Sequence, residues 1–254
     1  MISRYEVWLN NVPLSGIDDR LAILDISYDP VAIQNKTSIP AGRNGSMVTA
    51  RRQEKTAVTV TFELHIYNTQ ERQQVCQQVA AWAMHGGMLK TSDRPGQRLR
   101  CVCDNPPVIS SALNWTDALS VSFGGYVLPY WEQDVPSRVT TNDETTLFVA
   151  GNALQDAFVE VTVTPTVAIT RLTVTAGETE ITLSGINIPA EQTVKFWYDD
   201  DMFLHIDSGA TGLLSKRSAA SDDDLLIPCN KRSTVAVSAS GAVSATFSAR
   251  GLWV

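Results

Sequence analysis

The stretch AVTVTFELHIYNTQERQQVCQQVAAWAMHGGMLKTSDRPG, residues 57–96, joins a strand pattern directly to a helix pattern. Apolar and polar residues alternate from Val58 to Tyr67, which is the period-2 pattern of a strand with one buried face. After Asn68 the apolar residues change to helical spacing and gather on one face: Val75, Cys76, Val79, Trp82 and Ala83. The stretch therefore predicts a helix packed on a sheet.

Both ends of this helix carry sequence signals. Asn68 followed by Glu71 is a variant of the capping box, and Gly86-Gly87 supplies a left-handed stop. We predict a helix over residues 68–85. Its outward face is rich in glutamine and should meet water or a neighbouring subunit: Gln70, Arg72, Gln73, Gln77 and Gln78.

The remainder of the chain has the composition and spacing of β structure. Beyond residue 142, strand-like runs recur at intervals of about 8 to 12 residues, which is typical of a β-sandwich. The polar segment Glu132 to Asn142 marks a boundary between two domains. We predict a mainly β chain with an N-terminal β-sandwich over residues 1–135, which carries the helix and a long hairpin arm, and a C-terminal β-sandwich over residues 138–254.

The predicted arm spans residues 30–56, a polar reach that is rich in turn residues. It contains Pro40, Gly42 and the pair Asn44-Gly45, and Asn-Gly is a strong hairpin signal. We interpret the reach as an extended hairpin whose tip leaves the body of the domain.

Composition excludes several classes of protein. The 254 residues are 44% hydrophobic and 19% charged, which describes a folded chain, and the net charge of -7 opposes broad binding to nucleic acid. The N-terminus has no apolar region of a secretory signal, and no segment reaches the roughly 18 apolar residues of a membrane helix. We therefore expect a soluble protein made in the cytoplasm, with its four cysteines reduced.

No set of residues predicts catalysis. Cys101 and Cys103 share one face of a strand, where half of a metal site and two buried thiols are the alternatives, and we favour thiols. The three histidines, His65, His85 and His205, lie far apart in sequence and have no nucleophile beside them. We expect no enzyme activity, no catalytic residue and no cofactor.

The second half holds two acidic triplets and an aromatic pair. The triplets Asp199–Asp201 and Asp222–Asp224 fit either calcium binding or solvated turns, and we assign no metal site, because both lack the spacing of a calcium loop. Trp197 and Tyr198 are candidate carbohydrate contacts. One of the two must point inward in a strand, and we expect core packing for Trp197.

The block from Val58 to Leu64, the helix, Gly87-Met88-Leu89 and the turn Ser92-Asp93-Arg94-Pro95-Gly96 resemble the N-terminal domain of siphophage distal tail proteins. This resemblance covers residues 1–132 in layout and is most specific over 57–103. The second half is similar to the galectin-like or carbohydrate-module-like sandwich of that family, and Arg250 to Trp253 is similar to its closing strand. The sugar motif of galectins is absent, since His205 is followed by Ile206-Asp207.

The resemblance implies a structural hub of a phage or prophage tail tip. It implies a ring, usually a hexamer, which joins the tail tube to the tail-tip and receptor-binding proteins and leaves an axial channel for DNA. The arm and the helix would then contact neighbouring subunits, for which we predict these residues: Ile39, Arg43, Met47, Arg51, Arg52, Gln73 and Gln77. An adhesion or carbohydrate-binding module and a tail-tube-like protein are the alternatives.

Overall fold

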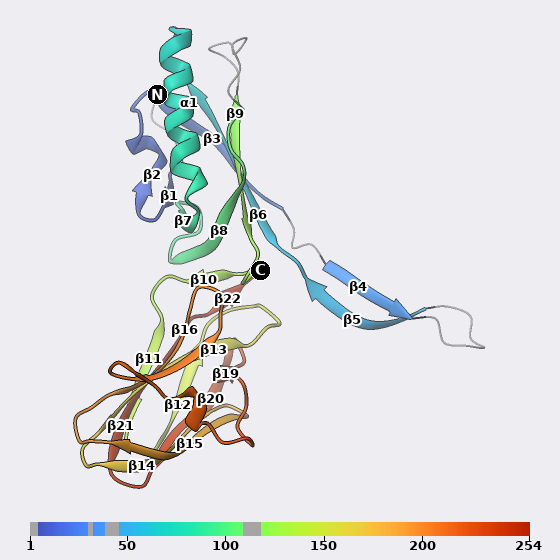
Figure 1. Ribbon diagram of the computed structural model, residues 1–254. Coiled ribbons are helices and arrows are strands. Elements are labelled where there is room, and N and C mark those ends of the chain that lie inside the picture. The colour runs from blue at the N-terminus through green and yellow to red at the C-terminus, as the bar shows by residue number, and fades with distance from the viewer. Residues whose placement is uncertain (1–4, 30–32, 39–45, 109–117) are drawn as a thin grey trace. The chain divides into compact units, whose positions relative to one another are not determined.

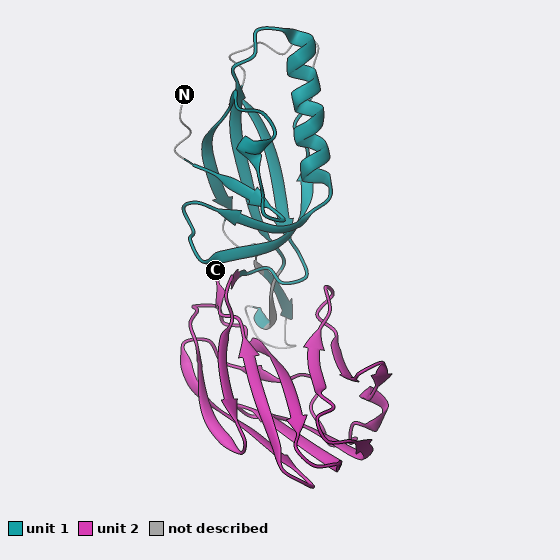
Figure 2. Cartoon of the chain, turned by 90° about the vertical axis from the view of Figure 1, so that its left-hand side faces the viewer, with its two compact units in different colours: residues 1–131 teal, residues 132–254 magenta. Residues whose placement is uncertain are grey.

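The computed structural model describes residues 5–29, 33–38, 46–108 and 118–254. It is mainly β with one α-helix in the described residues (Figure 1), as the sequence predicts. The chain divides into two compact units, unit 1 (Met1–Trp131) and unit 2 (Glu132–Val254), shown in different colours in Figure 2. The division falls at the first residue of the polar segment 132–142 and a few residues before the predicted end of the first domain at residue 135.

Unit 1 is built on one antiparallel sheet in the order β2-β1-β7-β8-β9-β6-β3, and Figure 2 shows the helix α1 running along this sheet. Among these elements, only β10 extends past Trp131, the last residue of unit 1. The elements of unit 1 are β1 Val7–Leu9, β2 Val12–Pro13, η1 Leu14–Gly16, β3 Leu21–Asp29, β4 Ile33–Ser38, β5 Met47–Gln53, β6 Thr56–Leu64, α1 Thr69–Met84, β7 Gly87–Thr91, β8 Gln97–Asn105, β9 Leu119–Gly125 and β10 Trp131–Gln133.

Strand β6 lies inside the sheet, paired with β3 on one side and β9 on the other. Every second side chain of β6 is buried, as the alternation in its sequence predicts. Val58, Val60 and Phe62 are completely buried. The predicted strand with one buried face is confirmed.

The helix α1 begins and ends where its caps predict. The Asn68 side chain accepts hydrogen bonds from the backbone N–H groups of Gln70, at 2.9 Å, and Glu71, at 3.3 Å. Beyond the C-cap His85, Gly86 has a φ of +59°, the left-handed conformation that stops a helix. The buried face matches the prediction except at Trp82, which is half-buried: Val75, Cys76, Val79 and Ala83.

One residue of the predicted outward face is wrong. Arg72 is only 3% exposed, and its Nε donates a hydrogen bond of 3.0 Å to the carbonyl oxygen of Ile66. The Arg72 Nη2 donates to the same oxygen. Ile66 lies in the connection between β6 and α1, where no strand partner reaches this carbonyl, and the long arginine side chain supplies the donors that it needs.

The predicted arm is a hairpin of β4 and β5, which form a two-stranded sheet of their own (Figure 1). Among the described residues, neither strand pairs with any other strand. The predicted turn at Asn44-Gly45 lies outside the described residues. The strand β5 leads after two residues into β6, so the hairpin is an outgrowth of the central β3 and β6 pair.

Unit 2 packs two antiparallel sheets around a shared core, which is a β-sandwich. One sheet has the order β11-β21-β13-β16-β17-β18, with β19 also paired to β13, and the other has the order β12-β20-β14-β15. The elements are β11 Ser137–Thr141, β12 Glu144–Val149, β13 Ala157–Pro165, β14 Ile169–Ala176, β15 Thr179–Ile188, β16 Val194–Tyr198, β17 Leu204–Ser208, β18 Thr211–Gly212, η2 Leu214–Lys216, β19 Leu226–Ile227, β20 Lys231–Ala239, β21 Val243–Ala249 and β22 Leu252–Trp253.

The first and last segments of unit 2 are bonded to each other. The backbone N–H of Gln133 donates to the carbonyl oxygen of Gly251 at 2.8 Å. Arg250 Nη1 donates to the carbonyl oxygen of Gln133 at 2.8 Å and also to that of Asp134. The C-terminal segment thus closes the sandwich onto its own start.

Candidate functional site

The β4 and β5 hairpin exposes apolar side chains on both of its faces. Met47 is 55% exposed and its neighbour Val48 is 60% exposed. Adjacent residues of a strand point to opposite faces, so neither face is covered at this point of the hairpin. Of the other interface residues predicted in the arm, Arg51 and Arg52 lie in β5, whereas Ile39 and Arg43 lie outside the described residues.

The outer side of α1 carries a stripe without charge. We define the helix stripe as Gln73, Gln77, Ala81 and Met84, which recur every three or four residues and so lie along one side of the helix. Gln73 is half-buried, the other three are exposed, and Met84 is 71% exposed. From Gln73 to Met84 the helix has no charged residue, and depletion of charge is a property of the centres of protein interfaces.

The turn Ser92 to Gly96 is hydrogen-bonded to the residue before β1 and to the edge strand β3. Ser92 exchanges two hydrogen bonds with Glu6, from Glu6 N to Ser92 Oγ at 2.9 Å and from Ser92 N to Glu6 O at 3.0 Å. The Tyr28 hydroxyl donates to Asp93, with distances of 2.6 Å to Oδ1 and 2.7 Å to Oδ2. The turn therefore links the segment before β1 to the strand β3, in addition to reversing the chain.

Aromatic stacking completes what we call the Tyr28 cluster, which consists of Tyr28, Thr91, Asp93, Arg94 and Trp131. The Arg94 guanidinium lies 4.4 Å from the centre of the Tyr28 ring and 5.0 Å from that of Trp131. The two rings meet edge to face, with centres 5.7 Å apart. Burial raises the pKa of Tyr28, and the hydrogen bond to the Asp93 carboxylate raises it further.

A second group, the Lys55 cluster, consists of Lys55, Asp104 and Tyr126. Lys55 Nζ lies 3.1 Å from Asp104 Oδ2, and the Tyr126 hydroxyl donates to Asp104 Oδ1 at 2.7 Å. The bonds to Asp104 and then to Tyr126 raise the pKa of Lys55. Next to this cluster, Thr56 Oγ1 donates a buried hydrogen bond of 2.6 Å to the carbonyl oxygen of Pro129.

Sequence reasoning missed both clusters, since their members lie far apart in the chain. Tyr28 and Asp93 are 65 positions apart, and Lys55 and Asp104 are 49 positions apart. The turn motif itself was the available signal. Its Asp93 and Arg94 are the residues that contact Tyr28.

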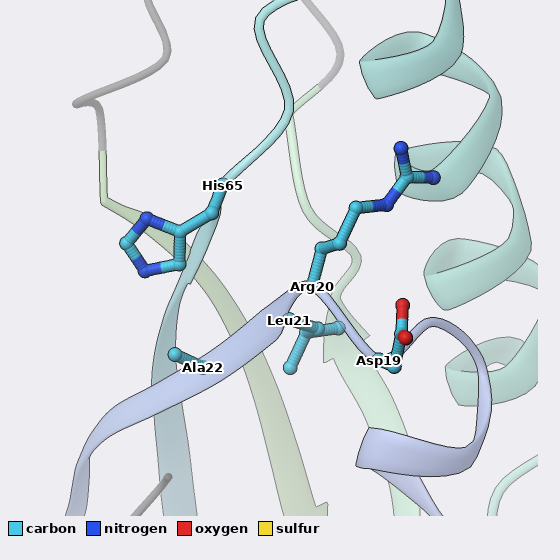
Figure 3. A pocket seen from close by; sticks show the side chains of 5 residues that line it. All are labelled: Asp19, Arg20, Leu21, Ala22 and His65. Carbon is cyan, nitrogen blue, oxygen red and sulfur yellow. The ribbon is translucent and has the colours of Figure 1, made fainter. Parts of the chain in front are cut away.

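A hollow of about 360 Å³ is lined by Asp19, Arg20, Leu21, Ala22 and His65 (Figure 3). The Arg20 guanidinium is bound to Asp18 at 2.8 Å and to Glu71 at 3.1 Å, which hold it as a surface ion pair. In Figure 3 the His65 ring points away from that guanidinium. The lining therefore brings no nucleophile and base together.

In unit 2 the expectation that Trp197 packs in the core is wrong. Trp197 is 39% exposed, whereas Tyr198 is 9% exposed and its hydroxyl accepts a hydrogen bond of 2.9 Å from the backbone N–H of Leu225. The reason is the phase of the strand, because Val194, Phe196 and Tyr198 share the inward face of β16.

The exposed Trp197 forms a stacked pair with His205 on the neighbouring strand. Their ring centres lie 4.6 Å apart with 21° between the planes. Trp197 Nε1 donates to Asp207 Oδ2 at 2.7 Å, and His205 Nε2 lies 3.0 Å from Asp199 Oδ2. The pair and its two carboxylates form a small polar and aromatic platform on the outer face of the sheet.

Both acidic triplets support turns. Asp199 Oδ1 accepts from the backbone N–H groups of Asp201 at 3.0 Å and Phe203 at 2.9 Å. Asp222 Oδ2 accepts from the Glu180 N–H at 2.7 Å, which protects the open edge of β15. In the part of the chain that the structure describes, no three acidic, histidine or cysteine side chains are grouped as a metal site would require.

The cysteines Cys101 and Cys103 lie on β8 as free thiols. Cys101 is buried and Cys103 is half-buried. Burial raises the pKa of the Cys101 thiol to about 12. Thiol packing, which the sequence favours for this pair, agrees with these positions.

The fold is that of a two-unit β protein whose first unit is a helix-backed sheet with a hairpin. It is similar to the crystal structure of the Dit protein (gp 19.1) of phage SPP1, described as a paradigm of the hub adsorption apparatus in phages that infect Gram-positive bacteria. The two sequences are 10% identical, the match covers 97% of this chain and 98% of that one, and the TM-score is 0.71. The resemblance to distal tail proteins predicted from the sequence is confirmed at the level of the fold.

Two structures of the phage P2 baseplate in its activated conformation also match. The structure with Ca is 10% identical and covers 99% of this chain and 98% of that chain, with a TM-score of 0.51. The structure with Sr is 9% identical and covers 98% of both chains, also with a TM-score of 0.51. No protein-family model and no curated protein sequence matches the chain.

No helix in the described residues is both long enough and apolar enough to cross a membrane.

Proposed function

We propose that this chain is the structural hub of a siphophage or prophage tail tip. The observation that carries the proposal is the match to the SPP1 hub protein, which extends over 97% of this chain and thus includes both units. A tail-tube-like protein is less well supported, because a tube subunit has no need of a second sandwich. The proposed role is structural, without catalysis or a cofactor.

We propose a ring of identical subunits, most simply a hexamer, with the hairpin and the helix as contacts. The uncovered faces of the hairpin at Met47 and Val48 and the uncharged helix stripe support this assignment. The predicted contact residues remain Ile39, Arg43, Met47, Arg51, Arg52, Gln73 and Gln77.

The axial channel of the ring would let DNA pass during ejection. A net charge of -7 supports this role, because nucleic acid adheres to surfaces rich in lysine and arginine. The partners are the tail tube, the tape-measure protein and the tail-tip or receptor-binding proteins. The ring would be assembled in the host cytoplasm and end at the tip of the virion tail.

The test is negative-stain electron microscopy of the purified chain together with a measurement of particle mass. Rings of a single copy number are the expected result, with a mass that is a multiple of 27.7 kDa. The measurement is repeated in the presence of a tail-tube protein from the same phage or prophage. Monomers in both samples would count decisively against the ring.

A second candidate function is carbohydrate binding by unit 2, favoured by the exposed Trp197 beside Asp207 and His205. Indole faces with neighbouring carboxylates suit sugar rings. The full chain would be applied to a glycan array beside Trp197→Ala. Binding that the variant loses while it keeps its melting temperature would support a sugar site, and an array without signal would refute it.

A further inference from the structure

The hairpin leaves unit 1 from two strand ends that are both fixed by side chains. We define the hairpin root as Tyr28 and Asp29, which end β3, together with Lys55 and Thr56, at the start of β6. The two strands are still in register here, since Tyr28 pairs with Val58 and Asp29 with Ala57. Beyond this point the described hairpin strands pair only with each other. The direction of the hairpin therefore depends on its root.

The β3 side of the root is held by the Tyr28 cluster. The Tyr28 hydroxyl is bound by Asp93 and lies 3.0 Å from Thr91 Oγ1, and the ring is packed against Arg94 and Trp131. Hydrogen bonds and ring contacts in different directions leave the side chain one orientation. The C-terminal end of β3 is thus bonded to β7 and to the turn that follows β7.

The β6 side is held by the Lys55 cluster and by Thr56. Lys55 binds Asp104 on β8, and Tyr126 binds the other oxygen of the same carboxylate. The Thr56 hydroxyl is buried and bound to Pro129. Lys55 is one residue from the first position of β6, so it anchors the segment through which the hairpin returns to the sheet.

We propose that Tyr28 and Lys55 are positioning residues for assembly, which hold the hairpin in the direction in which it docks on a second copy of this chain. This inference rests on the proposed ring. A segment that is ordered before it binds loses less conformational entropy on binding, and an isolated two-stranded ribbon has little order of its own. The clusters supply that order from bonds within unit 1.

The experiment compares the full chain with Tyr28→Phe, Lys55→Met and the double variant. Tyr28→Phe keeps the packing of the aromatic side chain and removes the hydrogen bonds of its hydroxyl group to Asp93 and Thr91. Tyr198→Phe is the matched control, because it removes one hydroxyl with a backbone partner from unit 2. Lys195→Met, an exposed lysine of β16, is the control for the lost charge. Each protein is measured for melting temperature, particle mass against concentration, and amide hydrogen exchange at residues 26–29 and 54–58.

The expected result is that the root variants need about tenfold more protein to form half of their rings, while both controls assemble like the wild type. Amide exchange at the root should rise in the same variants and stay unchanged in the controls. Rings at unchanged concentration with faster exchange, or unchanged exchange at the root, would overturn the inference. If the wild-type chain forms no ring, either alone or with the tail-tube protein, the proposed function fails instead, and the exchange measurement still decides whether the clusters hold the root.

Discussion

At the scale of single residues, several charged side chains of unit 1 form hydrogen bonds that link separate segments of the chain. Arg72 is buried to satisfy one carbonyl oxygen, and Asp93 and Asp104 each bind a tyrosine hydroxyl. Burying a polar group is favourable only when it has partners, and Arg72 is the buried member of this set, so its bonds show where the fold needs a donor. The helical pattern placed Arg72 on the outward face because such a pattern registers polarity and not hydrogen-bond partners.

Replacing Arg72 by methionine should destabilise the protein. Methionine keeps most of the buried stem but leaves the Ile66 carbonyl without its side-chain donor, at a cost of about 1 to 3 kcal/mol in the free energy of unfolding. Urea unfolding measures this loss. Arg20→Met is the control, since Arg20 is an exposed partner of Asp18 and Glu71 and its loss should be smaller. Equal losses of unfolding free energy in the two variants would show that the hydrogen bond to the Ile66 carbonyl stabilises the fold no more than the exposed ion pairs of Arg20 do.

The Cys101 thiol should resist alkylation in the folded protein. Its pKa of about 12 and its burial keep it protonated and covered at pH 8, so iodoacetamide should modify it only after denaturation, as read by peptide mass spectrometry. The half-buried Cys229 is the internal comparison. Rapid native modification of Cys101 would contradict this environment.

The same thiol also affects stability at alkaline pH. The unfolded thiol loses its proton near its ordinary value of 9.0, whereas the folded thiol keeps it up to about 12. The contribution to stability is therefore complete below pH 9 and is lost as the pH rises toward 12. The folded Cys101→Ser variant should therefore lose less stability between pH 9 and pH 12 than the wild type, as measured by urea unfolding at a series of pH values.

At the scale of elements, local sequence patterns were sufficient for the strand β6, for α1 and for the stop between α1 and β7. Alternation and helical spacing are properties of neighbouring residues, and caps act within one turn. Predicting the phase of β16 needed one more step. Val194 and Phe196 already indicate the inward face, which assigns Tyr198 to the core and Trp197 to the surface.

The stop at Gly86 should tolerate no side chain. Its φ of +59° strains an alanine by about 1 to 2 kcal/mol, and a Cβ atom there would lie 2.8 Å from the Cys101 carbonyl oxygen. Gly185→Ala is the matched control, because Gly185 has a φ of +63° and open space around it. Gly86→Ala should therefore lower the melting temperature more than Gly185→Ala. An equal effect of the two would leave only the backbone conformation as the cause.

At the scale of the whole molecule, the sequence predicted a mainly β chain with one helix and a hairpin, and the fold agrees. It did not predict how the hairpin is anchored. Tyr28, Asp93 and Trp131 meet only after the sheet has formed, and nothing in their local sequence records that contact. Local sequence patterns do not predict long-range side-chain bonds of this kind.

Deleting residues 35–52 tests the hairpin as a whole. The strands β3 and β6 keep their register without it, so the shortened chain should stay folded, with a melting temperature changed by less than about 5 °C. It should remain monomeric at concentrations at which the full chain forms rings, as measured by light scattering. Normal rings from the shortened chain would remove the hairpin from the assembly contacts.

The bond between Gln133 and Gly251 has an evolutionary consequence. Because residues near the two ends of unit 2 are hydrogen-bonded to each other, the unit can be exchanged or inserted as a whole without disturbing its own sandwich. Recombination can thus replace or enlarge this unit between lineages while the helix-backed sheet and its hairpin descend unaltered. Divergence should accordingly be faster in unit 2 than in unit 1.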